Sequence, residues 1–288
     1  MATATAELQR ALLAQVSRDL PWRRTRDPWA ILVSEAMLQQ TQVLRVAPRW
    51  ARFLERFPTP SACAEATAGA VVAEWAGLGY NRRAVALHAA ALACVVRHGG
   101  AVPAALEDLL ALPGVGPYTA RAVLAFAYER DVGVLDVNAA RVLARAVAGR
   151  RLTLGEAQAV ADASVPEGQG WAWNQAVLDH GATVCRKVAP ACGRCVLAGW
   201  CRWRVAGGTD PAEGSAAAGG RQSRFQGSDR QGRGRLVAAL VAGPVPCRHL
   251  AATCGWPGDE PRAATVAAGL VADGLATWAA DGASLHLP

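Results

Sequence analysis

Four cysteines within 17 residues constrain the fold of this chain more than any other feature. The stretch "CRKVAPACGRCVLAGWC" places Cys185, Cys192, Cys195 and Cys201 in a C-x6-C-x2-C-x5-C pattern. Four thiolates this close in sequence can wrap one metal centre, so we expect the segment to form a small loop tied by a metal. Zinc sites with four cysteines usually contain two close pairs, and here only one pair is close. An iron–sulfur cluster also takes four cysteines and tolerates looser spacing.

Helical periodicity dominates the sequence before these cysteines. Apolar residues recur with a period of 3.6, proline and glycine interrupt the pattern, and convincing alternating strands are absent. These patterns predict an all-α fold. The helices expected before Cys185 cover residues 5–18, 28–42, 45–57, 68–76, 80–98, 105–111, 117–129, 136–147, 155–164 and 171–184.

The composition changes after residue 204. Residues 205–235 are rich in Gly, Ala and Ser and lack apolar periodicity, which predicts a flexible linker. Short helices are then expected over 235–243, 246–254 and 261–273, followed by a hairpin that turns at Asp281-Gly282. Three short helices and a hairpin predict a small winged-helix-like module over residues 236–288.

The net charge of +7 lies entirely in the first part of the chain. Residues 1–204 contain 23 basic and 16 acidic side chains, whereas residues 205–288 contain seven of each. Every basic residue except Lys187 is an arginine, which favours a polyanionic partner such as nucleic acid. The chain opens without a secretory signal and has no apolar run of ~18 residues. We therefore expect a cytoplasmic protein without a membrane partner, whose cysteines stay reduced or bind metal.

The stretch "LPGVGPYTARA", residues 112–122, predicts a helix, a tight turn and a second helix. Apolar residues recur at helical spacing on both sides of the turn. Gly114 and Gly116 suit a turn that needs a positive φ or a close backbone approach. The N–H groups at the start of the second helix favour an anion, although a plain turn between helices would have the same pattern.

Together, this stretch, "LDVN" at 135–138 and the four cysteines resemble the endonuclease III superfamily of DNA glycosylases. Within it, "PWR" at 21–23, "SEAMLQQTQV" at 34–43 and "GLGYNRRA" at 77–84 are similar to the A/G-specific adenine glycosylases of the MutY family. The resemblance covers residues 8–204. It implies a monofunctional enzyme that removes adenine opposite 8-oxoguanine or guanine from double-stranded DNA in base excision repair. We expect it to act as a monomer on the nucleoid.

The resemblance also implies the two-lobed helix-hairpin-helix glycosylase fold. We expect an N-terminal helical segment over 1–26 to join an iron–sulfur lobe over 134–204. A six-helix barrel lobe is expected over 27–133, with the helix-hairpin-helix at 106–128. In such a fold the four cysteines are implied to hold a 4Fe-4S cluster.

Three residues are implied to carry the chemistry. Glu35 lies among apolar neighbours, and a carboxyl group in an apolar pocket is pushed toward its protonated form, which suits a general acid that protonates adenine N7. Asp136 is implied to stay ionised and to stabilise the positive sugar that forms as the glycosidic bond breaks; its structural alternative is a helix N-cap. Tyr118 stands where lyase relatives carry a lysine. A tyrosine cannot form a Schiff base and is implied instead to hydrogen-bond a carboxylate beside the reacting sugar.

The implied DNA contacts come from several motifs. Gly114 and Gly116 are implied to hold a DNA phosphate through their backbone. Because the target base must be flipped out of the duplex, Gln40, Leu78 and Tyr80 are implied to wedge into the base stack. A core position for Leu78 and a solvent-facing position for Gln40 are the structural alternatives.

The adenine pocket draws on other segments. Trp22, Arg23 and Gln175 are implied to line it, since an amide can pair with the donor and acceptor edge of adenine. Asn138 stands where lyase relatives carry histidine and is a further residue of the DNA site. The neighbouring pair Arg82 and Arg83 is expected either to meet phosphates or to be solvated.

Two other functions fit parts of the sequence. One is a glycosylase on the same scaffold that removes another base, such as thymine opposite guanine. The other is a non-enzymatic iron–sulfur protein that binds DNA, for which Glu35 and Asp136 would be dispensable. Typical family members carry a large C-terminal domain that inspects 8-oxoguanine, and residues 236–288 are too few for it. This part of the chain resembles shorter actinobacterial-type members.

Overall fold

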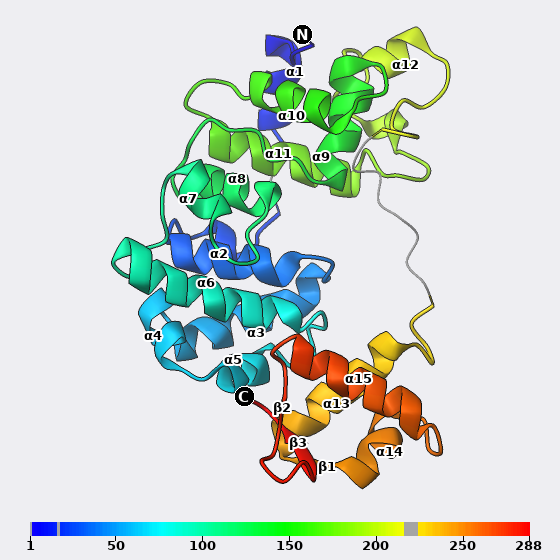
Figure 1. Ribbon diagram of the computed structural model, residues 1–288. Helices are drawn as coiled ribbons and strands as arrows, with labels where there is room; N and C mark the ends of the chain where they lie inside the picture. Colours follow the sequence, from blue (N-terminus) through cyan, green and yellow to red (C-terminus); the bar gives the residue numbers. More distant parts are fainter. Residues whose placement is uncertain (1, 16–17, 216–223) are drawn as a thin grey trace. The chain divides into compact units, whose positions relative to one another are not determined.

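The computed structural model describes residues 2–15, 18–215 and 224–288 and confirms the predicted helical fold (Figure 1). The chain divides into two compact units. Unit 1 comprises Met1–Ile31, Ala104–Leu106 and Gly116–Arg221, and unit 2 comprises Leu32–Pro103, Glu107–Val115 and Gln222–Pro288. No helix in the described part of the chain is long and apolar enough to cross a membrane.

Unit 1 is built from helices that flank the cysteine segment. Its elements are α1 (Ala6–Leu13), η1 (Pro21–Arg23), α8 (Pro117–Phe126), α9 (Val137–Val142), the π-helical turn η2 (Leu143–Ala148), α10 (Leu154–Ala163), α11 (Gly170–Thr183), η3 (Cys192–Arg194) and α12 (Arg202–Ala206). Thr5 caps α1 and Thr153 forms a capping box with Glu156 at α10, so two of these helices begin where local side chains satisfy their first N–H groups.

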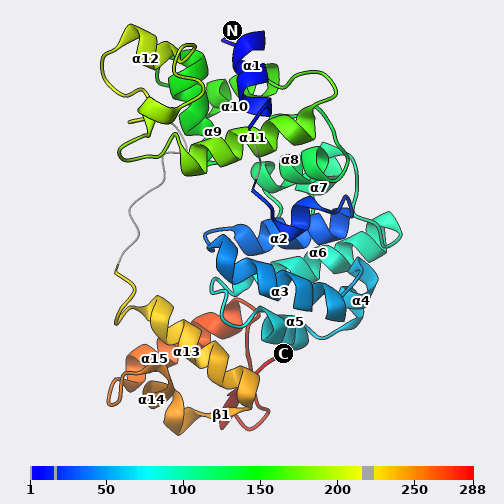
Figure 2. The ribbon, with the colours of Figure 1, turned by 180° about the vertical axis from the view of Figure 1, so that it is seen from behind.

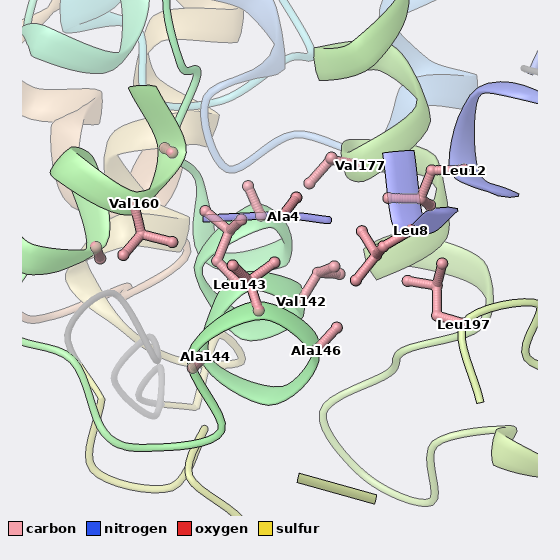
Figure 3. Close-up of a cluster of buried hydrophobic side chains, with 14 of the residues drawn as sticks. Ala4, Leu8, Leu12, Val142, Leu143, Ala144, Ala146, Val160, Val177 and Leu197 are labelled. Atoms are coloured by element: carbon pink, nitrogen blue, oxygen red, sulfur yellow. The ribbon is translucent and has the colours of Figure 1, made fainter. Parts of the chain in front are cut away.

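The core of unit 1 joins distant segments (Figure 3). Leu8 and Leu12 of α1 pack with Val142 of α9 and Val177 of α11. Leu197, from the segment between the third and fourth cysteines, is buried in the same cluster. The cysteine segment is therefore anchored in the hydrophobic core at a residue between two of its cysteines.

Unit 2 contains a helical layer, which includes most of α2. Its helices are α2 (Pro28–Leu38), α3 (Val43–Arg56), α4 (Pro60–Glu65), α5 (Ala68–Trp75), α6 (Arg82–His98) and α7 (Leu106–Leu110). The first residues of α2 and Leu106 of α7 belong to unit 1, so the chain passes between the units inside these helices. Helix α5 packs on α3 and α6, and α4 packs on α6 (Figure 2). Phe53 packs edge-on against Phe57 and Trp75, with centroids 5.0 and 6.2 Å apart.

Residues 224–288, here named the C-terminal module, complete unit 2. Its elements are α13 (Asp229–Ala242), β1 (Val245–Pro246), η4 (Cys247–His249), α14 (Leu250–Cys254), α15 (Glu260–Ala272), β2 (Thr277–Trp278) and β3 (Ser284–His286). The strands form an antiparallel sheet in the order β1-β3-β2, in which Leu285 is paired with Val245 and with Trp278. The predicted short helices and hairpin are present.

The structure differs from the predicted linker at 205–235. The segment begins inside α12 and ends inside α13. Between them, Asp210 pairs with Arg145, and Ser215 is buried and accepts a hydrogen bond from the N–H of Leu152. Residues 216–223 lie outside the described residues. These contacts are made by isolated polar or small side chains. They produce no apolar periodicity in the sequence, and the segment was therefore predicted to be a linker.

Candidate functional site

Asp136 occupies the N-cap of α9. Its Oδ1 accepts hydrogen bonds from the N–H groups of Asn138 and Ala139, both at 2.7 Å, and its Oδ2 accepts one from Nδ2 of Asn138, also at 2.7 Å. Burial raises the pKa of Asp136 above the ordinary aspartate value, although these hydrogen bonds and the nearby Arg141 oppose the rise. The structural alternative considered for Asp136 is thus present. The cap fixes the position of the carboxylate through both of its oxygens.

Arg141 extends this arrangement to the first cysteine. Its Nη2 donates to Oδ1 of Asn138 at 2.9 Å and to the carbonyl of Gly181 at 2.6 Å, and its Nε donates to the carbonyl of Cys185 at 2.7 Å. Any Cβ at Gly181 would lie 2.7–2.9 Å from Asn138, so only glycine lets α11 approach α9 this closely. One guanidinium therefore joins the residues around Asp136 to the cysteine segment.

The four cysteines line one cavity. Cys185, Cys192, Cys195 and Cys201 are all among its lining residues, and the cavity is partly open to solvent. Local backbone bonds compact the segment: the N–H of Cys195 donates to the carbonyl of Cys192 and the N–H of Cys201 to that of Leu197. The described residues contain no group of three or more His, Cys, Asp or Glu side chains that could hold a metal ion. Even so, the four cysteines, which are spread over 17 residues of the sequence, line one and the same cavity.

Two charged residues beside this cavity escaped the sequence analysis. Arg145, with only 1% of its surface exposed, donates to Asp210 and, at 2.8 Å, to the carbonyl of Arg186. Its Nη1 also lies 3.4 Å from Sγ of Cys185. The sequence signal that could have identified Arg145 is its spacing from Arg141. Residues four apart lie on the same side of a helix, so both arginines face the same neighbours. Asp210 lay in the segment interpreted as a linker and gave no signal.

His180 is a further residue that the sequence did not single out. Its Nε2 lies 3.4 Å from Sγ of Cys195, and the ring is buried. Burial lowers the pKa of His180 to about 4, so the imidazole is neutral at physiological pH.

The predicted helix-hairpin-helix turn lies between α7 and α8. Gly114 has a φ of +76°, and a Cβ there would lie 2.7 Å from Cβ of Ala86, so conformation and packing both require glycine. Gly116 is the N-cap of α8 and provides no side-chain cap, and a Cβ there would meet no atom of the described residues within 4 Å. The start of α8 is therefore open to a close ligand. Tyr118 lies in its first turn and is half-buried.

Glu35 is buried in α2. Only 4% of its surface is exposed, and Ile31, Leu32 and Met37 of the same helix are buried with it. Glu35 is therefore a buried residue on a segment whose apolar neighbours are buried too. Glu35, Gln40, Leu78, Tyr80 and Gly114 belong to unit 2; the other predicted site residues, including Asp136 and the cysteines, belong to unit 1.

Arg23 forms a buried ion pair on α11. Its Nη1 and Nη2 donate to the two carboxylate oxygens of Asp179 at 2.7 and 2.8 Å, and Arg18 donates to the same carboxylate. Trp22, which precedes Arg23 in the sequence, is buried. Gln175 is also buried and lies one helical turn before Asp179 on α11. The structure therefore gives Arg23 a structural partner, and the sequence analysis had assigned it only to the adenine pocket.

Gln40 and Tyr80 share an uncommon backbone conformation. Their φ values are +55° and +48°, and non-glycine residues rarely adopt such values. Arg83 ties the two segments together, since its Nη1 donates to the carbonyls of Met37 and Gln39, at 2.9 and 2.6 Å, and its Nη2 to that of Gly79 at 2.8 Å. Strained residues held in place in this way cluster at functional sites.

Arg83 and Leu78 are both held inside the protein in this loop. Burial lowers the pKa of Arg83 to about 10, and backbone carbonyls engage its guanidinium, which favours a structural role over the expected phosphate contact or solvation. Arg82 pairs with Asp273. Leu78 is only 3% exposed, which favours core packing over a wedge in DNA. Tyr80 is 39% exposed and remains the accessible side chain.

Comparison with known proteins agrees with this architecture. Residues 33–159 match the HhH-GPD superfamily of base excision DNA repair proteins. The adenine DNA glycosylase of Mycolicibacterium smegmatis is 42% identical over 269 residues, which is 92% of this chain and 90% of that protein. The chain belongs to the adenine DNA glycosylase family. The family protein of Mycobacterium tuberculosis is also 42% identical, over 92% of this chain and 88% of that one.

Longer and more distant relatives match a smaller part of the chain. The human adenine DNA glycosylase is 38% identical over 204 residues, which is 66% of this chain and 37% of the human protein. A thermostable thymine-DNA glycosylase of known structure has a TM-score of 0.63 and 26% identity, over 69% of this chain and 95% of that one. An endonuclease III structure in a DNA complex has a TM-score of 0.58 at 21% identity, over 66% of this chain and 89% of that one. These structures agree in fold with the family assignment.

Proposed function

We propose that this protein is a monofunctional adenine DNA glycosylase of base excision repair. The observation that carries the proposal is the 42% identity to curated adenine DNA glycosylases over about nine-tenths of both chains. The substrate is double-stranded DNA in which adenine lies opposite 8-oxoguanine or guanine. We propose that the enzyme acts as a monomer on nucleoid DNA in the cytoplasm.

In this proposal two carboxyl groups have opposite protonation states. Glu35, which is buried in α2, donates a proton to N7 of adenine, so the base leaves as a neutral molecule. Asp136 stays ionised and stabilises the positive charge that develops on the sugar. The three donors that hold Asp136 support this role, because they favour the carboxylate and fix its position before the bond breaks. Water then completes hydrolysis of the glycosidic bond.

We propose that the enzyme has no lyase activity, because a lyase needs a side-chain amine near the sugar to form a Schiff base. Tyr118 offers no amine for Schiff-base formation, and Lys187, in the cysteine segment, is the single lysine in the sequence. Gly116 and the first turn of α8 would hold a DNA phosphate, since an open helix N-terminus favours an anion. Trp22, Arg23, Gln175 and Asn138 would face the flipped adenine.

We propose that the cysteine cavity holds a 4Fe-4S cluster. All four cysteines line this cavity, and their spacing contains one close pair, whereas zinc sites with four cysteines usually contain two. The bound cluster would tie the loop together. Arg145 would stabilise it by donating toward Cys185. Protein prepared without oxygen should contain iron and absorb broadly near ~400 nm; one zinc and no iron per chain would contradict the cluster.

Base release from defined duplexes tests the activity. Duplexes carrying A:8-oxoguanine, A:G, A:C and T:G should be incubated with excess protein, with and without alkali. We expect adenine release from the first two, and strand breaks only after alkali. Thymine release from T:G would favour the thymine-specific alternative, and a borohydride-trapped covalent adduct would overturn the monofunctional assignment.

The two carboxyl groups can be tested with matched variants. Glu35→Gln and Asp136→Asn should bind the mispaired duplex but lose about 10²-fold or more in single-turnover rate. Glu55→Gln changes an exposed glutamate of α3 in the same unit as Glu35 and should behave as wild type. A variant of Glu35 or Asp136 that keeps a tenth of the wild-type rate would refute the role of that residue.

A further inference from the structure

The C-terminal module docks beside the loop that contains Tyr80. Asp273 pairs with Arg82, at the start of α6, at 3.2 Å and also with Arg233 of α13. The residue after Asp273 approaches α6 as well, since a Cβ on Gly274 would lie 3.4 Å from Val85. These contacts, all within unit 2, bring the start of α13 to the residue-77–83 loop.

A second contact fixes the other edge of the module. The N–H of Gly69, in the first turn of α5, donates to the carbonyl of Pro288 at 3.1 Å, and a Cβ on Gly69 would lie 2.3 Å from that oxygen. The module thus touches both α5 and α6, which flank the loop. Contacts with these two helices therefore fix the position of the C-terminal module within unit 2.

Charge within this part of the chain is sharply divided. Residues 224–235 contain four arginines and one aspartate, whereas residues 236–288 contain four acidic and two basic side chains. On α15 the exposed residues are the acidic Glu260 and the uncharged Pro261, Ala264, Thr265, Ala268 and Ala272. A polyanion would therefore be attracted to the start of α13 and not to α15.

Arg230 contacts two exposed aromatic residues at this basic end. Its Nη1 is 3.5 Å from the hydroxyl oxygen of Tyr80, and its Cζ lies 5.3 Å from the ring centroid of Phe225. Phe225 is 52% exposed and Tyr80 is 39% exposed. The nearby carboxylates already have arginine partners, Asp229 with Arg262 and Asp273 with Arg82 and Arg233.

We propose that Phe225 and Arg230 form, with Tyr80, a surface on which a nucleobase of the bound DNA stacks. Aromatic faces and guanidinium planes stack bases of any sequence, and a basic surrounding holds the attached backbone. The surface is made jointly by the Tyr80 loop and the C-terminal module, so the module contributes directly to DNA binding. This inference rests on the proposed function only in that the ligand is duplex DNA.

The test measures DNA affinity and not catalysis. The full-length protein is titrated with a duplex that carries an uncleavable 2′-fluoro-adenosine opposite guanine, at several salt concentrations. Phe225→Ala should weaken binding about 5- to 150-fold, the effect typical of one lost base stack, with an unchanged salt dependence. Arg230→Ala should weaken binding and lower the slope of log K against log[salt] by about 1.

Two controls lie in the same module. Trp278→Ala removes another exposed aromatic and Arg248→Ala another exposed arginine, and both should bind as wild type. Equal thermal unfolding midpoints for all four variants exclude loss of the fold. Binding of Phe225→Ala and Arg230→Ala within twofold of wild type, or equal losses in the controls, would overturn the proposal.

The outcome separates this inference from the proposed function. Wild-type protein that releases adenine while the Phe225 and Arg230 variants bind normally refutes only the stacking surface. Wild-type protein that releases no adenine while these variants bind the duplex weakly refutes only the adenine glycosylase activity.

Discussion

The carboxylate of Asp179 should be essential for the stability of unit 1. It accepts hydrogen bonds from Arg23 at 2.7 and 2.8 Å and from Arg18 at 2.6 Å, and the Arg23 and Asp179 side chains are only 7% and 10% exposed. Removing one partner of a buried ion pair leaves an uncompensated charge and costs about 3–5 kcal/mol. Asparagine keeps one acceptor oxygen but turns an amide N–H₂ toward the other donors. We therefore expect Asp179→Asn to cost about 3 kcal/mol.

This loss is large enough to measure by thermal unfolding. One kcal/mol shifts Tm by about 2–4 °C in a protein of this size class, so Asp179→Asn should lower Tm by about 6–12 °C when followed by circular dichroism. Asp19→Asn is the matched control, because Asp19 pairs with Arg24 on the surface, where both side chains are about 70% exposed. Exposed pairs contribute little, and this variant should unfold as wild type.

The pH dependence provides a second check. Burial raises the pKa of Asp179, but the hydrogen bonds from Arg23 and Arg18 outweigh it and leave the pKa below the ordinary value. A lowered pKa in the folded state stabilises the protein above the unfolded-state pKa of about 3.9. That stabilisation is lost as the pH falls through the lower, folded-state pKa. The difference in Tm between wild type and Asp179→Asn should thus be constant from pH 5 to 8 and narrow below about pH 4. If Asp179→Asn changed Tm no more than Asp19→Asn, the buried charge network would be refuted.

Three further predictions follow from the site. Gly114→Ala should destabilise the protein by about 1–3 kcal/mol, because φ is positive and no space exists for a Cβ, whereas Gly116→Ala should keep its Tm but weaken DNA binding. Because burial raises the pKa of Asp136 and catalysis uses its ionised form, single-turnover base release should fall on acidification with a midpoint above about 4, the ordinary aspartate value; a midpoint at or below that value would contradict the assignment. Arg145→Met should lower the iron content per chain, while Arg150→Met, at an exposed ion pair, should not.

Local sequence patterns determined the secondary structure and the positions of the motifs. The helices over 68–75, 82–98 and 154–163 lie within one or two residues of their predicted bounds, because apolar periodicity and caps act over a few neighbouring residues. The glycines of the hairpin and the cysteine spacing were visible for the same reason. The N-cap geometry of Asp136 was available as an alternative from its place before a helix.

Only the tertiary structure decided what the arginines and the loop residues contact. Arg23 meets Asp179 across 156 positions, Arg83 meets carbonyls 44–47 positions away, and Arg145 meets Asp210 across 65. The sequence does not distinguish an arginine that binds a buried carbonyl from one that binds a DNA phosphate. The same guanidinium N–H groups donate in both cases, and only the acceptor differs. The burial of Leu78 and the docking of the C-terminal module on α5 and α6 depend equally on distant partners. These partners come together only when segments far apart in the sequence pack against each other, and a local sequence pattern does not contain that information.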